Sequence, residues 1–419
     1  MGGCVRDSLL GRVPTDWDVT TSALPEETKA AFPGCPVLET GIRHGTVTLL
    51  LDGMPLEVTT YRVDGAYSDH RRPDRVAFTR SLREDLARRD FTVNALAYHP
   101  DRGLVDYFGG REDLERGLLR CVGEPARRFE EDALRILRGM RFSAVLGFSI
   151  GEETARRMEE KKPLLEFVAR ERVAAELKKL LCGPAAAQAL RAFPQVAAQI
   201  LPELRPMFGF GQHNPYHCYD IWEHTLHAVE AVPPQLVLRL GMLFHDVGKP
   251  ACFTLDDQGT GHFYGHEERG GELARQALHR LRFDSQTIRR VCLLVREHSV
   301  VLRPDPRRIR RQLSRWGAET LRQLWEVKVA DCKAKGDSVA YRLEGLEQTR
   351  LTLEQVLEEE QCFSLKDLQM NGNELIALGY RGREIGAMLK TLLERVVDGE
   401  LENTREALTR YAADQKLEE

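Results

Sequence analysis

The 419-residue sequence has few of the features that mark membrane and secreted proteins. It contains no run of about 18 apolar residues, the length that a membrane-spanning helix requires. Its nine cysteines include no Cys-x-x-Cys pair, which argues against a zinc ribbon and favours reduced thiols. No signal peptide is recognisable. These absences predict a cytoplasmic protein, without a membrane segment, whose length allows two to four domains.

The sequence also lacks a large net charge, which is −4 although 30% of the residues are charged. Any nucleic-acid contact must therefore come from a local cluster. Six arginines lie between residues 303 and 315, with Asp305 as the only acidic residue among them. A solvated helix face is the alternative, but this density favours a phosphate-binding strip. We predict RNA contacts from Arg307, Arg308, Arg310 and Arg311.

The N-terminal stretch combines a glycine turn with two acidic residues. Gly3 precedes a short helix predicted over residues 4–10, whose amide groups could hold an anion. Asp16 and Asp18 flank Trp17 just before a β-branched run, and residues two apart on a strand share a face. We therefore expect both carboxylates on one side and the tryptophan in the core. Carboxylates beside a phosphate cradle predict a magnesium site, although a solvated turn is the alternative.

A β-hairpin is predicted next. Residues 46–51 and 55–61 are rich in β-branched and apolar side chains, and Asp52-Gly53 between them is a strong turn signal. Glu57 faces away from its apolar neighbours on the second strand. It could be a third catalytic carboxylate beside the two aspartates, or an exposed strand glutamate.

These motifs resemble those of the class II tRNA nucleotidyltransferase and poly(A) polymerase family of the polymerase-β superfamily. The resemblance rests on Gly-Gly-Cys-Val-Arg-Asp followed by Asp-Trp-Asp, on Arg-Arg-Asp-Phe-Thr-Val-Asn-Ala-Leu at 88–96, and on residues 106–114. In that family a helix and a strand precede the glycine turn, so we expect this head domain to lack both. A basic loop at 67–78 is similar to the loop that helps such enzymes accept ATP.

The resemblance implies a set of nucleotide-binding residues. Arginines would grip the triphosphate and an aspartate would accept from the ribose hydroxyls. We expect Arg88 to Asn94 to lie on one helix. The residues are Gly3, Arg6, Arg88, Arg89, Asp90 and Asn94.

A charged stripe is predicted on a helix over residues 128–142. Asp132, Arg135, Arg138 and Arg141 recur every three residues, which is usually a salt-bridged surface. The family uses such a Glu-Asp-x-x-Arg helix as a protein template. Asp132 accepting from an exocyclic amine and Arg135 donating to the ring would select C and A over U and G. Arg138 and Arg141 would contact the phosphates or the wall of the nucleotide pocket.

After residue 205 comes a series of histidines and aspartates that could bind metal, and their order resembles that of the HD phosphohydrolase superfamily. Imidazoles and carboxylates in this order could bind one or two divalent metals and activate water against a phosphoester. Some relatives with this module hydrolyse phosphoesters and others keep only its fold. We expect His213 and His217 to be loop residues. The predicted ligands are His224, His245, Asp246, His266, His298 and Asp331.

The fold class predicted is α+β. A small polymerase-β-like nucleotidyltransferase head with a mixed sheet is followed by helical parts. A helix-turn-helix is expected over 367–386, with a final helix that ends near residue 411. The predicted boundaries are 1–124 for the head, 125–205 for the neck, 206–345 for the HD body and 346–419 for the tail.

The function implied is template-independent addition of C, C and A to the tRNA 3′ end. CTP and ATP would be the substrates, pyrophosphate the product, and Mg²⁺ on Asp16 and Asp18 the cofactor, with a second divalent metal possible in the HD module. The acceptor and T-stem backbone of tRNA would be recognised by shape. One alternative is an A-adding enzyme or poly(A) polymerase. Another is a metal-dependent phosphohydrolase with a non-catalytic head. Nothing in the sequence predicts the oligomeric state.

Overall fold

The computed structural model describes residues 1–14, 16–65, 76–213, 218–336, 341–359 and 363–418. The chain forms two compact units, each with buried apolar side chains. Unit 1 comprises Met1–Pro206 and Gln276–Ser285, and unit 2 comprises Met207–Arg275 and Gln286–Glu419. Within the described residues, no helix combines the length and the apolar character of a membrane span.

Unit 1 begins with a four-stranded mixed sheet in the order β1-β4-β3-β2. The first pair is parallel and the others are antiparallel. The predicted hairpin is confirmed, because Asp52 and Gly53 join β3 to β4 with φ values of 50° and 79°, as a type I′ turn requires. Val47, Leu49 and Val58 form the buried core of the sheet. The strands are β1 (Val19–Thr21), β2 (Val37–Leu38), β3 (Thr46–Leu51) and β4 (Met54–Thr60).

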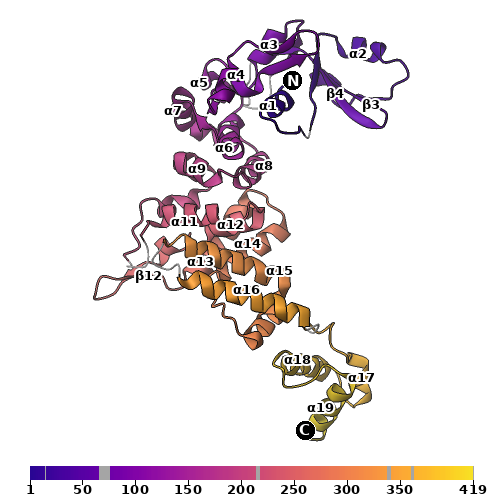
Figure 1. Cartoon of the computed structure of the whole chain (residues 1–419), viewed down its shortest axis with the longest axis vertical. Coiled ribbons are helices and arrows are strands. Elements are labelled where there is room, and N and C mark those ends of the chain that lie inside the picture. Colours follow the sequence, from indigo (N-terminus) through magenta and orange to yellow (C-terminus); the bar gives the residue numbers. More distant parts are fainter. Residues whose placement is uncertain (15, 66–75, 214–217, 337–340, 360–362, 419) are drawn as a thin grey trace. The chain divides into compact units, whose positions relative to one another are not determined.

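Short helices and two-stranded pairs surround and follow this sheet in unit 1 (Figure 1). The helices are α1 (Gly3–Leu9), α2 (Pro25–Ala31), α3 (Leu82–Ala87), α4 (Gly110–Glu115), α5 (Pro125–Glu131), α6 (Leu134–Leu146), α7 (Glu152–Lys161), α8 (Arg170–Leu181), α9 (Ala186–Ala192) and α10 (Pro194–Ile200). The pairs are β5 (Arg62–Asp64) with β6 (Val76–Phe78), β7 (Leu96–His99) with β8 (Gly103–Asp106), and β9 (Leu118–Leu119) with β10 (Ser149–Ile150).

Helix α6 occupies the centre of the helical part of unit 1. Its residues Ile136 and Leu137 are buried, and α8 and α9 pack against it (Figure 1). Gly139 permits the close approach of α7 and of Phe91 in the head, since a Cβ there would lie 3.2 Å from Met158 Sδ and 3.3 Å from the Phe91 ring. The position of α6 is therefore fixed tightly against the head.

Among its described residues, unit 2 is helical apart from one small hairpin. The long helices α15 and α16 pack against each other, and α15 also contacts α11 and α12 (Figure 1). A separate cluster that includes Leu375, Leu392 and Leu408 holds the last three helices together. The elements are α11 (Ile221–Ala231), α12 (Leu236–Phe244), β11 (Thr254–Leu255), β12 (Gly261–His262), α13 (His266–Arg280), α14 (Ser285–Glu297), α15 (Pro306–Lys333), α16 (Tyr341–Glu359), α17 (Gly372–Ala377), α18 (Arg383–Val397) and α19 (Arg405–Glu418).

Three local predictions in unit 1 are wrong, namely the core position of Trp17, the helix over 88–94 and the unbroken helix over 128–142. Trp17 is 58% exposed and does not lie in the core. It precedes β1, which starts at Val19, so the in-and-out alternation of strand side chains does not apply to it. Residues 88–94 are not one helix: α3 ends at Ala87, and Asp90 accepts from the amide of Phe91, a local bond that competes with a helix.

The predicted helix over 128–142 is broken at Asp132. This residue has extended backbone angles (φ −142°, ψ 103°), and its carboxylate accepts from the amide of Leu134 at 3.1 Å. An aspartate that hydrogen-bonds to the backbone two residues onward turns the chain and starts a new helix. The stripe therefore begins before the helix that carries its three arginines.

The remaining predicted elements that the structure describes agree with it except at the C-terminal end of the last helix. The short helix over 4–10 and the turn at Gly379 and Gly382 are confirmed, but the last helix extends to Glu418 and not to 411. His213 lies outside helices and strands as expected. The basic loop at 67–78 lies outside the described residues except for β6, and so does His217.

Candidate functional site

The predicted catalytic carboxylates lie on and just before two neighbouring strands of the head sheet, β4 and β1. Asp16 and Asp18 are exposed and precede β1, which Val19 begins by pairing with Val58 of β4. Glu57, also exposed, immediately precedes Val58 on β4, just as Asp18 immediately precedes Val19, the first residue of β1. None of the compact groups of ligand atoms that the described residues form includes these three carboxylates. Their catalytic role stays a prediction.

A continuous chain of buried hydrogen bonds links α1 to α6. Arg6 Nη1 donates to Asn94 Oδ1 at 2.5 Å, and Asn94 Nδ2 donates to Asp90 Oδ1 at 3.0 Å. Arg138 Nε then donates to Asp90 Oδ2 at 2.7 Å. Four residues that the sequence placed in the nucleotide site are thus brought together. Asn94 is suited to the middle of the chain, because an amide can accept from an arginine and donate to a carboxylate.

Asp90 is ionised although it is only 7% exposed. Burial by itself would raise the pKa of this carboxyl group, but the charge of Arg138 and the hydrogen bonds from Asn94 and the Phe91 amide outweigh it and lower the pKa to about 2. The carboxylate is therefore a charged anchor for α6 within the head.

Three arginines surround the buried ring of Phe142. The guanidinium carbons of Arg6, Arg138 and Arg141 lie 5.2, 5.4 and 3.8 Å from the ring centroid. Arg141 Nε also lies 2.7 Å from Glu176 Oε2 of α8. Sequence reasoning missed Glu176, because one glutamate on a helix gives no signal of a partner 35 residues away.

The glycine turn fits closely against Arg89. A Cβ on Gly2, whose φ is +79°, would lie 2.5 Å from Arg89 Nη1. Gly3 has more room, since its Cβ would meet Arg6 Nη2 only at 3.7 Å. Arg88 points elsewhere and pairs with Asp85 at 2.9 Å. The positive φ of Gly2 thus favours glycine there, next to the Arg89 guanidinium, whereas the first arginine of the Arg-Arg-Asp motif is held by an acidic residue of α3.

The side chains of the two residues predicted to read the base pair with different partners, although the Arg135 amide donates to the Asp132 carbonyl at 3.0 Å. Asp132 accepts from Arg172 Nη2 at 2.8 Å, while Arg135 Nη1 donates to Glu131 at 2.7 Å. Arg135 also donates to the carbonyl of Arg88 at 3.0 Å. The helix break at Asp132 separates the pair. Arg172 and Glu131, which sequence reasoning missed, therefore fix the two side chains, and the base-reading role stays a prediction.

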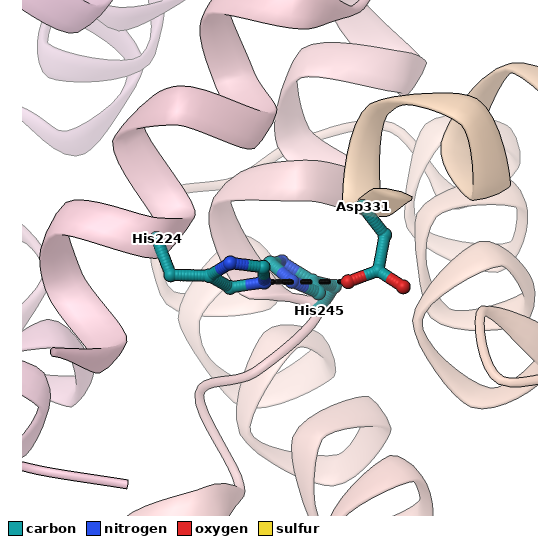
Figure 2. A group of neighbouring side chains, drawn as sticks. All are labelled: His224, His245 and Asp331. Carbon is teal, nitrogen blue, oxygen red and sulfur yellow. Dashed lines mark hydrogen bonds and ion pairs between the residues drawn. The ribbon is translucent and has the colours of Figure 1, made fainter. Parts of the chain in front are cut away.

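Unit 2 contains two groups of potential metal ligands, here called the histidine centre. The ligand atoms within each group lie within 4.8 Å of one another. Figure 2 shows the first group, in which the side chains from α11, the end of α12 and α15 point toward one another, with His224 Nε2 3.3 Å from Asp331 Oδ1. The groups are His224, His245 and Asp331, and Asp246, His266 and His298.

All four imidazole rings of the histidine centre are oriented in the same way. Each uses Nδ1 to contact a backbone carbonyl, at 2.7 to 3.2 Å, and so leaves Nε2 for the centre. The Nε2 atoms of His245 and His224 are 3.2 Å apart, and those of His266 and His298 are 3.3 Å apart. Protein metal sites orient histidine in this way. The carbonyls belong to Ala334, Met242, Phe263 and Val295.

The electrostatics of the centre favour a cation. Burial, together with the neighbouring His245, lowers the pKa of His298 to about 3, so this imidazole is neutral. Burial opposes ionisation of Asp246, but His245 and Lys249 hold the pKa of this carboxyl group well below its usual value. Asp246 Oδ2 also lies 3.5 Å from His224 Nε2, which places this carboxylate between the two groups. Neutral imidazoles and carboxylates are the donor set of divalent transition metals.

A cavity of about 360 Å³, here called the metal-side cavity, opens at the histidine centre. Its wall includes Asp246, His266 and His298 together with the ammonium groups of Lys249, Lys328 and Lys335. The lysines, which the sequence analysis did not select, place positive charge where a phosphoester would lie.

The predicted RNA-binding arginines contact the tail. Arg311 Nε lies 2.6 Å from Asp398 Oδ1, and Arg307 Nη2 lies 2.9 Å from Glu400 Oε1. Arg310 donates to the carbonyl of Val397 at 2.8 Å. Arg308, in contrast, is exposed. The strip thus joins α15 to the end of α18, and RNA would have to share these groups with acidic side chains.

Comparison with protein families gives three matches. The poly A polymerase head domain matches residues 1–120. The RNA and SrmB-binding site of polymerase A matches residues 147–208, and tRNA nucleotidyltransferase domain 2 matches residues 269–412.

Curated relatives and solved structures agree with these matches. The CCA-adding enzyme of Streptococcus pneumoniae is 34% identical over 99% of this chain and 93% of its own length. That of Geobacillus thermodenitrificans is 50% identical over 190 residues, and this alignment spans only 46% of that relative. The crystal structure of the Bacillus stearothermophilus CCA-adding enzyme in complex with CTP is similar with a TM-score of 0.74 at 28% identity, covering 100% of this chain and 92% of that one. The Thermotoga maritima enzyme with tRNA shares the fold, with a TM-score of 0.58 at 21% identity, covering 99% of this chain and 90% of that one.

Proposed function

We propose a function from one premise, that this chain belongs to the CCA-adding enzyme family of tRNA nucleotidyltransferases. The chain attaches C, C and A to the 3′ end of tRNA without a nucleic-acid template, using CTP and ATP and releasing pyrophosphate. The observation that carries this proposal is the similarity to a CCA-adding enzyme along 99% of the chain. Incorporation assays distinguish this function from that of an A-adding enzyme, a poly(A) polymerase or a hydrolase alone.

The head supplies the groups for phosphoryl transfer. Asp16 and Asp18, with Glu57 at the neighbouring strand position, offer the exposed carboxylates that Mg²⁺ prefers. Bound there, Mg²⁺ would lower the pKa of the tRNA 3′-hydroxyl and neutralise charge on the leaving pyrophosphate. Arg6 and Arg89, beside the glycine turn, hold the triphosphate. Their positions are set by Asn94.

Base selection is assigned to the start of α6. Asp132 accepts from the exocyclic amine of cytosine or adenine, and Arg135 donates to the ring, a pattern that uracil and guanine do not match. Arg172 and Glu131 hold these two side chains in place in the absence of nucleotide. A base that fits would exchange these contacts for its own, whereas a wrong base would leave buried polar groups unpaired.

The decisive experiment supplies each labelled triphosphate separately to purified protein with tRNAs that end before CCA, after the first C and after the second C. Full CCA addition predicts CTP incorporation on the first two tRNAs and ATP incorporation on the third, with no product longer than CCA. An A-adding enzyme would extend only the third, and a poly(A) polymerase would give long products. No incorporation at all would leave only the hydrolase alternative.

A second function is favoured by the histidine centre. We propose that its imidazoles and carboxylates hold two divalent cations, which when bound would supply an activated water for phosphoester hydrolysis, as in the HD phosphohydrolases it resembles. The supporting observation is that four Nε2 atoms and two carboxylates converge while every Nδ1 contacts a carbonyl. Metal analysis of the protein, with phosphodiesterase and phosphomonoesterase assays in Mn²⁺, Mg²⁺ and Ni²⁺, tests it. Asp246→Asn should remove both metal and hydrolysis.

A further inference from the structure

A second cavity, of about 420 Å³, adjoins the metal-side cavity. The two cavities share Lys328, Asp331 and Lys335 of α15 and the residues just after it, so these side chains form a common wall. The rest of the second cavity comes from the segment before α15 and from the start of α16. Its own lining residues include Val301, Leu302, Arg303, Pro304, Arg342 and Leu346.

The wall of this second cavity combines two chemistries. Val301, Leu302, Pro304 and Leu346 provide apolar surface, while Arg303 and the two shared lysines provide positive charge beside the carboxylate of Asp331. Inorganic phosphate would leave the apolar surface uncovered, and a neutral apolar molecule would make no use of the positive charge. The volume lies within the range of small-molecule sites.

We propose that this cavity, here called the anion pocket, binds a small organic phosphate or phosphonate with an apolar or aromatic body. The anionic head lies toward Lys328 and Lys335, and the apolar body lies against Leu302 and Leu346. The anion pocket shares Lys328 and Lys335 with the metal-side cavity but has an apolar wall of its own.

The common wall couples the anion pocket to the histidine centre. Lys335 Nζ lies 2.7 Å from Asp331 Oδ2, and Lys328 Nζ donates to the carbonyl of His298 at 3.2 Å. Lys335 and a metal cation would repel each other around the same carboxylate. An anion that attracts Lys335 relieves this repulsion, so the pocket ligand and the metal favour each other's binding. This coupling rests on the proposed metal centre, whereas binding in the anion pocket does not.

Calorimetric titration of the full-length, EDTA-treated protein with phenylphosphonate tests the pocket. This probe has a carbon–phosphorus bond that a phosphoesterase does not cleave. We expect it to bind more tightly than inorganic phosphate or benzyl alcohol. Arg303→Glu and Val301→Asp change exposed side chains of the anion pocket alone and should each weaken binding about tenfold or more.

Tyr264→Ala is the matched control, because Tyr264 is 80% exposed and lines only the metal-side cavity. It should leave phenylphosphonate binding unchanged. Unaltered affinity in Arg303→Glu and Val301→Asp would overturn the proposal, and so would a loss in Tyr264→Ala that equals theirs. Failure of phenylphosphonate to bind better than phosphate would also overturn it.

A second titration tests the coupling. Mn²⁺ should bind more tightly when phenylphosphonate is present, and phenylphosphonate should bind more tightly by the same factor when Mn²⁺ is present. If Mn²⁺ binds with equal affinity in both cases, the coupling is wrong. If Mn²⁺ does not bind at all, the proposed metal centre fails, while the metal-free titration still decides the anion pocket.

Discussion

Arg138 of α6 and Asp90 of the head form a two-pronged ion pair, with Nε and Nη2 lying 2.7 and 2.6 Å from the same carboxylate oxygen. The pair lies at one end of the hydrogen-bonded chain that reaches Arg6 through Asn94. It therefore connects α6, which carries Arg135, to the arginine proposed to hold the triphosphate.

Acidification should weaken the Arg138–Asp90 ion pair between about pH 4 and pH 2. The pKa of Asp90 is about 2 in the folded chain and 3.8 ordinarily, so its contribution to stability is complete above about pH 4 and is lost as the pH falls toward 2. Asp90→Asn should lower the free energy of unfolding of unit 1 by about 2 kcal/mol at pH 7. Urea unfolding at several pH values checks this.

The difference between wild type and Asp90→Asn should shrink between pH 4 and 2, because the wild-type carboxyl group becomes neutral there. Glu115→Gln, an exposed change on α4, should show no such trend. A pH-independent difference would contradict the role of the charge.

Removing either predicted metal-binding carboxylate should abolish nucleotide transfer. Asp16→Asn and Asp18→Asn each remove a ligand charge without adding bulk, and we expect CTP and ATP incorporation to fall about a thousandfold or more. Affinity for tRNA, measured by filter binding, should change little. Asp101→Asn, an exposed loop change, is the control and should be fully active. Substantial incorporation by both variants would rule out the assignment.

Base selection should weaken when either Asp132 or its ion-pair partner Arg172 is changed. Asp132→Ala removes the proposed acceptor, and Arg172→Ala removes the arginine that holds it. Both should raise UTP and GTP misincorporation relative to CTP, by about 10- to 100-fold for Asp132→Ala and less for Arg172→Ala. Arg156→Ala, an exposed arginine that pairs with Glu153 on its own helix, should keep selection intact. Unchanged rejection of UTP and GTP by Asp132→Ala would disprove the template role.

The histidine centre should be separable from nucleotide addition. His245→Ala removes one inward-facing Nε2 and should reduce bound metal and any phosphoesterase activity to background. CCA addition by the same preparation should be unaffected. His279→Ala, an exposed histidine of α13 outside the centre, should keep both metal and activity. A loss of CCA addition in His245→Ala would show that the two sites are not independent.

Arg308 offers the clearest test of RNA binding by the strip, because it is exposed while its neighbours contact the tail. Arg308→Ala should weaken tRNA binding and reduce the slope of log K against log salt by about 1. Arg322→Ala, farther along α15 and paired with Glu354, is the control. An equal slope in Arg308→Ala and wild type would exclude a phosphate contact there.

The sequence was informative where structure depends on short-range pattern. The hairpin at Asp52-Gly53 was predictable because only certain residues tolerate positive φ in a tight turn. The convergence of the histidine-centre ligands could be anticipated from their order, but the inward orientation of the rings could not. That orientation depends on carbonyls such as that of Met242, and a carbonyl has no sequence signature.

The wrong predictions share a physical cause. Regular spacing suggested one helix across Asp132, but the side chain of this residue bonds to the backbone and competes with helix continuation. Spacing also cannot reveal partners from distant segments. Arg172 for Asp132 and Glu176 for Arg141 are both on α8, and only the packing of α8 against α6 brings them there.

Three of the four histidine rings contact the carbonyl that lies three residues earlier in the chain. The orientation of each of these rings is thus encoded within a single local segment. One substitution at such a position would remove an inward-facing ligand atom of the histidine centre while the surrounding helices stay as they are. Relatives that differ in metal binding at this centre are therefore expected to share one scaffold.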